Sequence, residues 1–62
     1  MKQKIKALEG KMARLQWTIN GFRHDMTGIV KKIKIAQFEF LINGVVIRKI
    51  RFENVIDIEL IK

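Results

Sequence analysis

Two Asn-Gly dipeptides, Asn20-Gly21 and Asn43-Gly44, constrain the fold of this chain more than any other feature. Each stands between runs of apolar and β-branched residues. Asn-Gly in that setting is the strongest short-range signal for a two-residue hairpin turn, because both residues tolerate positive φ. The sequence therefore predicts two β-hairpins and a mainly β fold.

The first hairpin has a clear register. Pairing outward from its turn places Ile19 opposite Phe22, Trp17 opposite His24 and Leu15 opposite Met26. All six side chains then lie on one face, since side chains alternate along a strand. A second interpretation stays open, because apolar residues from Ile5 to Ile29 also follow a spacing typical of a coiled coil. That helix would contain three glycines at about 1 kcal/mol each, so we favour the hairpin.

The remaining elements follow from periodicity. Ile5, Leu8 and Met12 recur at helical spacing and predict a short N-terminal helix over residues 1–12. We expect residues 13–62 to form a module of five strands, and the whole chain, 1–62, to be one domain. A long third strand is expected over Ile29–Ile42, with a bulge or sharp bend near Ala36-Gln37 where the apolar phase changes.

The second turn predicts the register of the last strands. It sets Ile42 opposite Val45, Phe40 opposite Ile47 and Glu39 opposite Arg48. A fourth strand then covers Val45–Phe52, and a fifth covers Val55–Ile61 after a short turn. The expected fold is a short helix followed by a strongly bent antiparallel sheet, or a small closed barrel without open edges.

Charge points to the class of partner. The chain has 13 Lys and Arg against 6 Asp and Glu, a net charge of +7. So high a charge suits nucleic acid first and an acidic protein second. The residues predicted to bind nucleic acid lie on the third and fourth strands: Lys31, Lys32, Lys34, Arg48, Lys49 and Arg51. Trp17 and Phe38 are the aromatic residues predicted to stack on bases.

Residue types argue against catalysis. The chain has no cysteine, serine or tyrosine, and its single histidine is His24. Asp57 and Glu59 share one strand face, which we interpret as a solvated face. We therefore expect no enzyme, catalytic residue, cofactor or metal site. No apolar run approaches the ~18 residues that span a membrane, and we expect a cytoplasmic protein that gains stability by forming a homo-oligomer.

The order of elements resembles the Sm-like barrel. Residues Thr18–Ile33 are similar to the first Sm motif, in which an apolar strand ends in Asn-Gly and a later glycine, here Gly28, opens the bent strand. Ile50-Arg51 resembles the start of the second motif. The chain departs from the pattern at Lys34 and Phe38, where Sm proteins place the Asp and Asn that bind a base. The resemblance thus implies the barrel fold rather than the Sm nucleotide pocket.

A second resemblance concerns the YolD-like family of Gram-positive bacteria and their phages. It rests on TGIVKKI at Thr27–Ile33 and on IRFENVIDIEL at Ile50–Leu60. That family has been proposed to replace the accessory subunit of error-prone DNA polymerases. The resemblance implies an alternative function as a protein-interaction accessory or regulator, for example a partner of a DNA-damage-tolerance polymerase, and it implies no catalytic residue.

Overall fold

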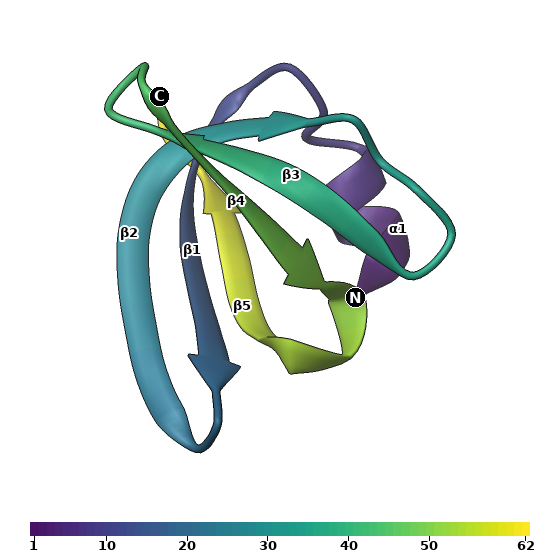
Figure 1. Ribbon diagram of the computed structural model, residues 1–62. Coiled ribbons are helices and arrows are strands. Elements are labelled where there is room, and N and C mark those ends of the chain that lie inside the picture. The colour runs from purple at the N-terminus through teal and green to yellow at the C-terminus, as the bar shows by residue number, and fades with distance from the viewer.

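The computed structural model describes residues 1–62 and contains one antiparallel sheet preceded by a short helix (Figure 1). The elements are α1 (Lys2–Lys6), β1 (Met12–Ile19), β2 (Phe22–Lys31), β3 (Gln37–Ile42), β4 (Val46–Arg51), the 3-10 turn η1 (Phe52–Asn54) and β5 (Val55–Leu60). The predicted mainly β fold, with an N-terminal helix and five strands, is confirmed.

The helix is shorter than predicted. It ends at Lys6 instead of continuing to residue 12. Gly10 has φ 80°, which interrupts a helix, and its backbone N–H donates to the Val30 carbonyl at 2.7 Å. The segment after α1 therefore lies along the end of β2. Its backbone forms hydrogen bonds with Val30 of β2 in place of hydrogen bonds within a longer helix.

The hairpin interpretation of residues 13–29 is correct, and the coiled-coil alternative is wrong. β1 and β2 pair in the predicted register, with Ile19 opposite Phe22 and Trp17 opposite His24. Asn20 and Gly21 both have positive φ, 50° and 82°, as the predicted turn requires.

The predicted third strand over Ile29–Ile42 is wrong in its extent. β2 continues through Gly28 to Lys31, and a loop over residues 32–36 reverses the chain before β3. The phase change near Ala36-Gln37 therefore marks a chain reversal rather than a bulge. Lys32 has φ 32°, which is incompatible with a continuous strand.

The second hairpin is offset by one residue from the prediction. Ile42 faces Val46, Phe40 faces Arg48, and Glu39 faces Lys49. The turn holds three residues, Asn43–Val45, and the Val45 N–H donates to the Ile42 carbonyl at 3.2 Å. One extra residue moves every later pair by one position, so Lys49 rather than Arg48 matches the charge of Glu39.

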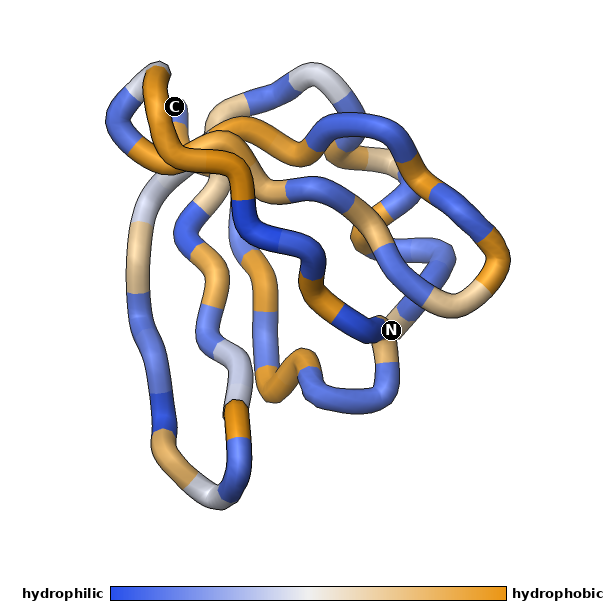
Figure 2. Tube along the Cα trace, viewed as in Figure 1, coloured by the Kyte–Doolittle hydropathy of each residue, from blue (hydrophilic) through white to orange (hydrophobic).

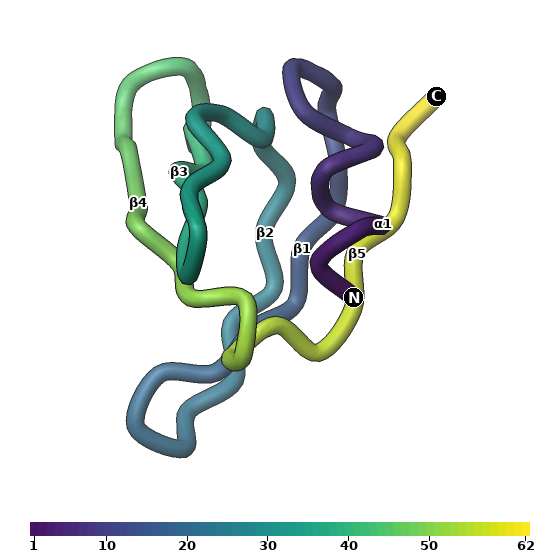
Figure 3. Tube along the Cα trace, turned by 90° about the vertical axis from the view of Figure 1, so that its right-hand side faces the viewer, coloured from purple at the N-terminus to yellow at the C-terminus, as the bar shows by residue number.

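The strands are ordered β4-β3-β2-β1-β5. Figure 3 shows β2 between β3 and β4 on one side and β1, β5 and α1 on the other. The end strands β4 and β5 do not pair with each other, so the sheet is not closed and a barrel stays a prediction.

The sheet has an inner and an outer face. The inner face carries the buried core, which includes Leu15, Trp17, Val30, Phe38, Phe40, Ile42, Ile50 and Ile58. Ile5 of α1 is fully buried in the same cluster, so the helix helps to close the core. The outer face carries the intervening polar residues, and hydrophilic and hydrophobic stretches alternate along the strands in Figure 2.

Candidate nucleic-acid interface

One half of the outer face, formed by β1, β2 and β5, is held by ion pairs around Arg14. Its guanidinium donates to both carboxylate oxygens of Asp25, at 3.0 and 2.6 Å, and lies 3.7 Å from Glu59. These residues meet because Arg14 lies close to Asp25 across the β1–β2 ladder and directly faces Glu59 on β5. In this half the carboxylates of Asp25 and Glu59 are paired with Arg14, and Arg23 forms no salt bridge.

The same pairing shifts the titration of these groups. The hydrogen bond from Arg14 holds the pKa of Asp25 below its usual value, and the pKa of Arg14 is raised in return. On β5, the pKa of Asp57 is lowered by its hydrogen bond with Lys4, which lies 3.3 Å away. Asp57 and Glu59 do share one face, as predicted, and both carboxylates are occupied by basic partners.

The other half of the outer face carries more positive than negative charge. Lys31, Glu39 and Lys49 form one row across β2, β3 and β4. Arg51 lies two residues further along β4, on the same face, and is opposite Gln37. We call the exposed set Lys31, Lys32, Lys34, Lys49 and Arg51 the basic surface. Within it only Arg51 has an acidic partner, Glu53, at 3.1 Å.

Lys32 and Lys34 are exposed residues of the loop at residues 32–36 that follows Lys31, and they do not lie on a strand as predicted. The loop is fixed at both ends. The Lys34 backbone N–H donates to the Gln37 carbonyl at 2.8 Å, and the Phe52 N–H donates to the Ala36 carbonyl at 3.1 Å. Lys2 of α1 adds a hydrogen bond to the Ile35 carbonyl at 2.6 Å. The two lysines are therefore presented by an ordered loop.

Arg48 does not join the basic surface. It faces Phe40 across the β3–β4 ladder, and Phe40 belongs to the buried inner face. Neighbouring residues on a strand point to opposite faces, so Arg48 and Lys49 lie on opposite sides of β4. The one-residue offset of the second hairpin decides which of the two lies on the outer face: the predicted register placed Arg48 opposite Glu39, and the structure places Lys49 there.

Neither aromatic residue that was predicted to stack is accessible. Trp17 is 2% exposed and Phe38 is fully buried. Trp17 packs against the edge of Phe40, and Phe38 packs against Phe52, so both serve the core. The exposed aromatic is instead Phe22, at 73%, beside the first hairpin turn. Its position next to Asn20-Gly21 was the signal available in the sequence.

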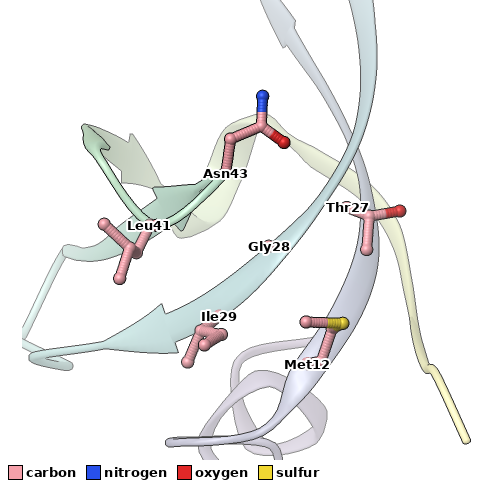
Figure 4. A pocket seen from close by; sticks show the side chains of 7 residues that line it. Met12, Thr27, Gly28, Ile29, Leu41 and Asn43 are labelled. Carbon is pink, nitrogen blue, oxygen red and sulfur yellow. The ribbon is translucent and has the colours of Figure 1, made fainter.

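A pocket lies on the outer face where β3 ends beside β2 (Figure 4). Its volume is about 340 Å³. We call it the notch pocket, and its lining residues are Met12, Thr27, Gly28, Ile29, Leu41, Asn43 and Gly44. Met12, Ile29 and Leu41 are successive partners across β1, β2 and β3, so one wall is a continuous apolar row.

The molecule has neither a grouped metal-ligand set nor a long apolar helix. No cluster of three His, Cys, Asp or Glu side chains has the arrangement that a metal ion requires. No helix has the length and apolar character needed to cross a bilayer.

The comparisons with known proteins give no relative. No protein-family model, curated protein or solved structure matches this chain. The fold and the charges described above are therefore the basis for assigning a function.

Proposed function

We propose that this protein is a small non-enzymatic module that binds nucleic acid through the basic surface. The observation that carries the proposal is the unequal distribution of partners on the outer face. The acidic residues Asp25, Asp57 and Glu59 are paired with Arg14 and Lys4 in the β1–β5 half. Lys31, Lys32, Lys34 and Lys49 have no ion pair, and Glu39 is the one acidic residue in their row. An unneutralised group of cations on adjacent elements is the electrostatic footprint of a phosphate-binding surface.

The mechanism is neutralisation of backbone phosphates. Lysine side chains on a sheet and an ordered loop contact phosphates without reading base edges, so binding is non-specific in sequence. Each phosphate contact releases condensed counterions, which makes the affinity fall as salt rises. Arg48, on the inner face, contributes to the general positive field rather than to these contacts.

We also propose that the chain self-associates through its two open edges. β4 and β5 each have one unpaired side, and both expose large apolar residues such as Ile47 at 58% and Ile56 at 41%. β4 carries Arg48, Lys49 and Arg51, so it repels a second copy of itself, whereas the carboxylates of Asp57 and Glu59 on β5 are already paired with Lys4 and Arg14 and leave that strand without excess charge. Pairing β4 of one copy with β5 of the next is a head-to-tail contact, which repeats into a ring or a filament.

The two family resemblances suggest an architecture for the assembled protein and an alternative partner. A short helix followed by five antiparallel strands, with a glycine in the second strand, supports the Sm-like barrel as the architecture of the assembled form. The YolD-like resemblance supports the alternative that the partner is a protein, such as a polymerase. The basic surface favours nucleic acid as the first hypothesis.

The experiment is a salt series with labelled single-stranded RNA, single-stranded DNA and duplex DNA. We expect the logarithm of the affinity to fall linearly with the logarithm of the salt concentration. Replacing Lys31 and Lys49 by alanine should reduce that slope by about one for each phosphate that is no longer neutralised. Lys62→Ala, at the end of the chain, is the matched control and should leave the slope unchanged.

The outcomes are distinct. A steep slope that the double variant reduces would establish the basic surface as the binding site. A steep slope that both variants leave unchanged would move binding to another part of the molecule. Absence of binding at low salt would reject the proposal and make the protein-accessory alternative the first hypothesis.

A further inference from the structure

The first part of β2, Phe22–Thr27, has a strand partner on one side only. β1 pairs with it throughout, but pairing with β3 starts at Gly28, opposite Ile42. β3 ends there, and the Asn43–Val45 turn leads the chain away to β4. Figures 1 and 3 both show the β1–β2 hairpin extending beyond β3 and β4. The sheet therefore has a third open edge, separate from those of β4 and β5.

The backbone along this edge has free hydrogen-bonding groups. In a two-residue hairpin the pair next to the turn, here Ile19 and Phe22, exchanges both hydrogen bonds, and such pairs then alternate. That alternation directs the backbone groups of Arg23, Asp25 and Thr27 away from β1. No turn, loop or cap hydrogen bond uses them. A row of this kind is a template for another strand.

Apolar side chains flank the open edge. Phe22 is 73% exposed and Met26 is 44% exposed, both on the side of the sheet that carries the core. Ile19, opposite Phe22, is also exposed. A strand added along β2 would cover Phe22 and Met26 with its own alternate side chains, because neighbouring strands place side chains at matching positions on one face.

The notch pocket lies at the inner end of this edge. It is formed where β3 stops beside β2, between the Thr27-Gly28 backbone and the Asn43-Gly44 turn (Figure 4). An added strand would end beside this notch, and a side chain that enters it must point to the outer face, opposite to the side chains that cover Phe22 and Met26. Extended peptides bind in this way when main-chain hydrogen bonds supply affinity and a pocket supplies selectivity.

The charge of this protein determines whether an acidic or a basic strand is favoured at the open edge. The guanidinium of Arg23, on the open edge, donates to the Gln16 side-chain oxygen at 2.9 Å and forms no salt bridge. The pKa of Asp25, whose own salt bridge is with Arg14, is lowered mainly by the hydrogen bond from Arg14, and the charge of Arg23 helps to lower it. The chain as a whole carries +7. An acidic partner is therefore favoured both at the edge and over longer range.

We propose that the Phe22–Thr27 edge accepts an extended acidic segment of a partner protein as an additional strand. Its alternate apolar side chains cover Phe22 and Met26 on the core side of the sheet. This site is separate from the basic surface, so the proposal is tested independently of nucleic-acid binding.

The test uses the full chain labelled with nitrogen-15 and two synthetic peptides, VEVEVEVE and VKVKVKVK. We expect the glutamate peptide to shift the amide signals of Arg23, Asp25 and Thr27 and to slow their hydrogen exchange. The lysine peptide should have no effect. Equal effects of both peptides, shifts confined to β4 or β5, or no shift at all would overturn the proposal.

The amide signals of Arg23, Asp25 and Thr27 also distinguish two other occupants of the edge. If these amides change with protein concentration alone, the edge is occupied by a second copy of the chain. If they change with an oligonucleotide and not with the glutamate peptide, the occupant is nucleic acid. Either result overturns the assignment of a peptide partner.

A pair of variants locates the site. Phe22→Ser should weaken binding of the glutamate peptide by about tenfold, as expected for an exposed aromatic anchor. Ile35→Ser is the matched control, because Ile35 is an apolar residue with 89% exposure in the loop at residues 32–36. Equal peptide affinities for the two variants would reject the edge as the site. Both exposed substitutions leave the core intact, and a thermal melt of each variant verifies this.

Discussion

The rings of Trp17 and His24 stack across the β1–β2 ladder, with centroids 5.3 Å apart and an angle of 19° between their planes. Trp17 is almost fully buried and also meets the edge of Phe40. His24 therefore covers one side of the largest side chain in the core. The pair ties the projecting hairpin to the body of the molecule.

Replacing His24 by alanine should lower the free energy of unfolding by about 1 kcal/mol, the usual contribution of a stacked ring pair beyond simple burial. Urea denaturation followed by tryptophan fluorescence measures this change. Arg23→Ala is a suitable control, since Arg23 is exposed and contacts only Gln16, and it should change stability by less than about 0.5 kcal/mol. Equal losses for both variants would mean that the stack adds no stability.

Gly28→Ala should destabilise the sheet by about 1–3 kcal/mol, the usual range for overpacking. A β carbon at position 28 would overlap the carbonyl oxygen of Leu41 and lie 3.0 Å from the Phe40 ring. Because Leu41 contributes backbone here, the clash cannot be relieved by a side-chain rotation. Thermal unfolding checks the loss, with Thr27→Ala as the neighbouring exposed control. An unchanged melting temperature for Gly28→Ala would contradict the close β2–β3 approach.

The Arg14–Asp25 pair predicts a pH dependence. The pKa of Asp25 is lowered in the folded state, so the carboxylate stabilises the fold above its unfolded pKa. That contribution disappears as the pH falls through the lowered folded value. We expect carbon-detected NMR titration to give Asp25 a lower pKa in the native protein than in Arg14→Gln. Identical titration curves for the two proteins would show that the ion pair is not maintained in solution.

Self-association should depend on the apolar residues of the open edges. Ile56→Lys places a charge on the exposed edge strand β5 and should reduce the association constant by about tenfold, because charged residues oppose edge pairing. Sedimentation velocity over a protein concentration series measures the change. Ile35→Lys adds the same charge at an exposed loop position and should have little effect. A wild-type chain that stays monomeric at all concentrations would reject self-association itself.

The local parts of the fold were predictable from the sequence. Asn20-Gly21 favours the first hairpin and its register, because a two-residue turn of this type requires positive φ at both residues. The second hairpin shows the limit of the same rule. Asn43 and Gly44 also have positive φ, yet Val45 joins the turn, and the sequence does not distinguish a two-residue turn from a three-residue turn.

The candidate site was predictable only in part. The excess of lysine and arginine indicated a basic surface. Which of these residues belong to it depends on the strand register and on the loop at residues 32–36. Lys49 and Arg48 are neighbours in sequence and lie on opposite faces. The burial of Trp17 and Phe38 depends on packing between elements that local patterns do not specify. Long-range packing decides which aromatic residues are accessible.

The pairing of β1 with β5 has a consequence for the order of folding. The β1–β2 and β3–β4 ladders join segments that are adjacent in sequence, whereas Arg14 meets Glu59 from the far end of the chain. Contacts between distant segments form slowly because the intervening chain must first lose entropy. The two hairpins are thus expected to form early, and docking of residues 55–60 against β1 is the slow event that completes the cooperative transition.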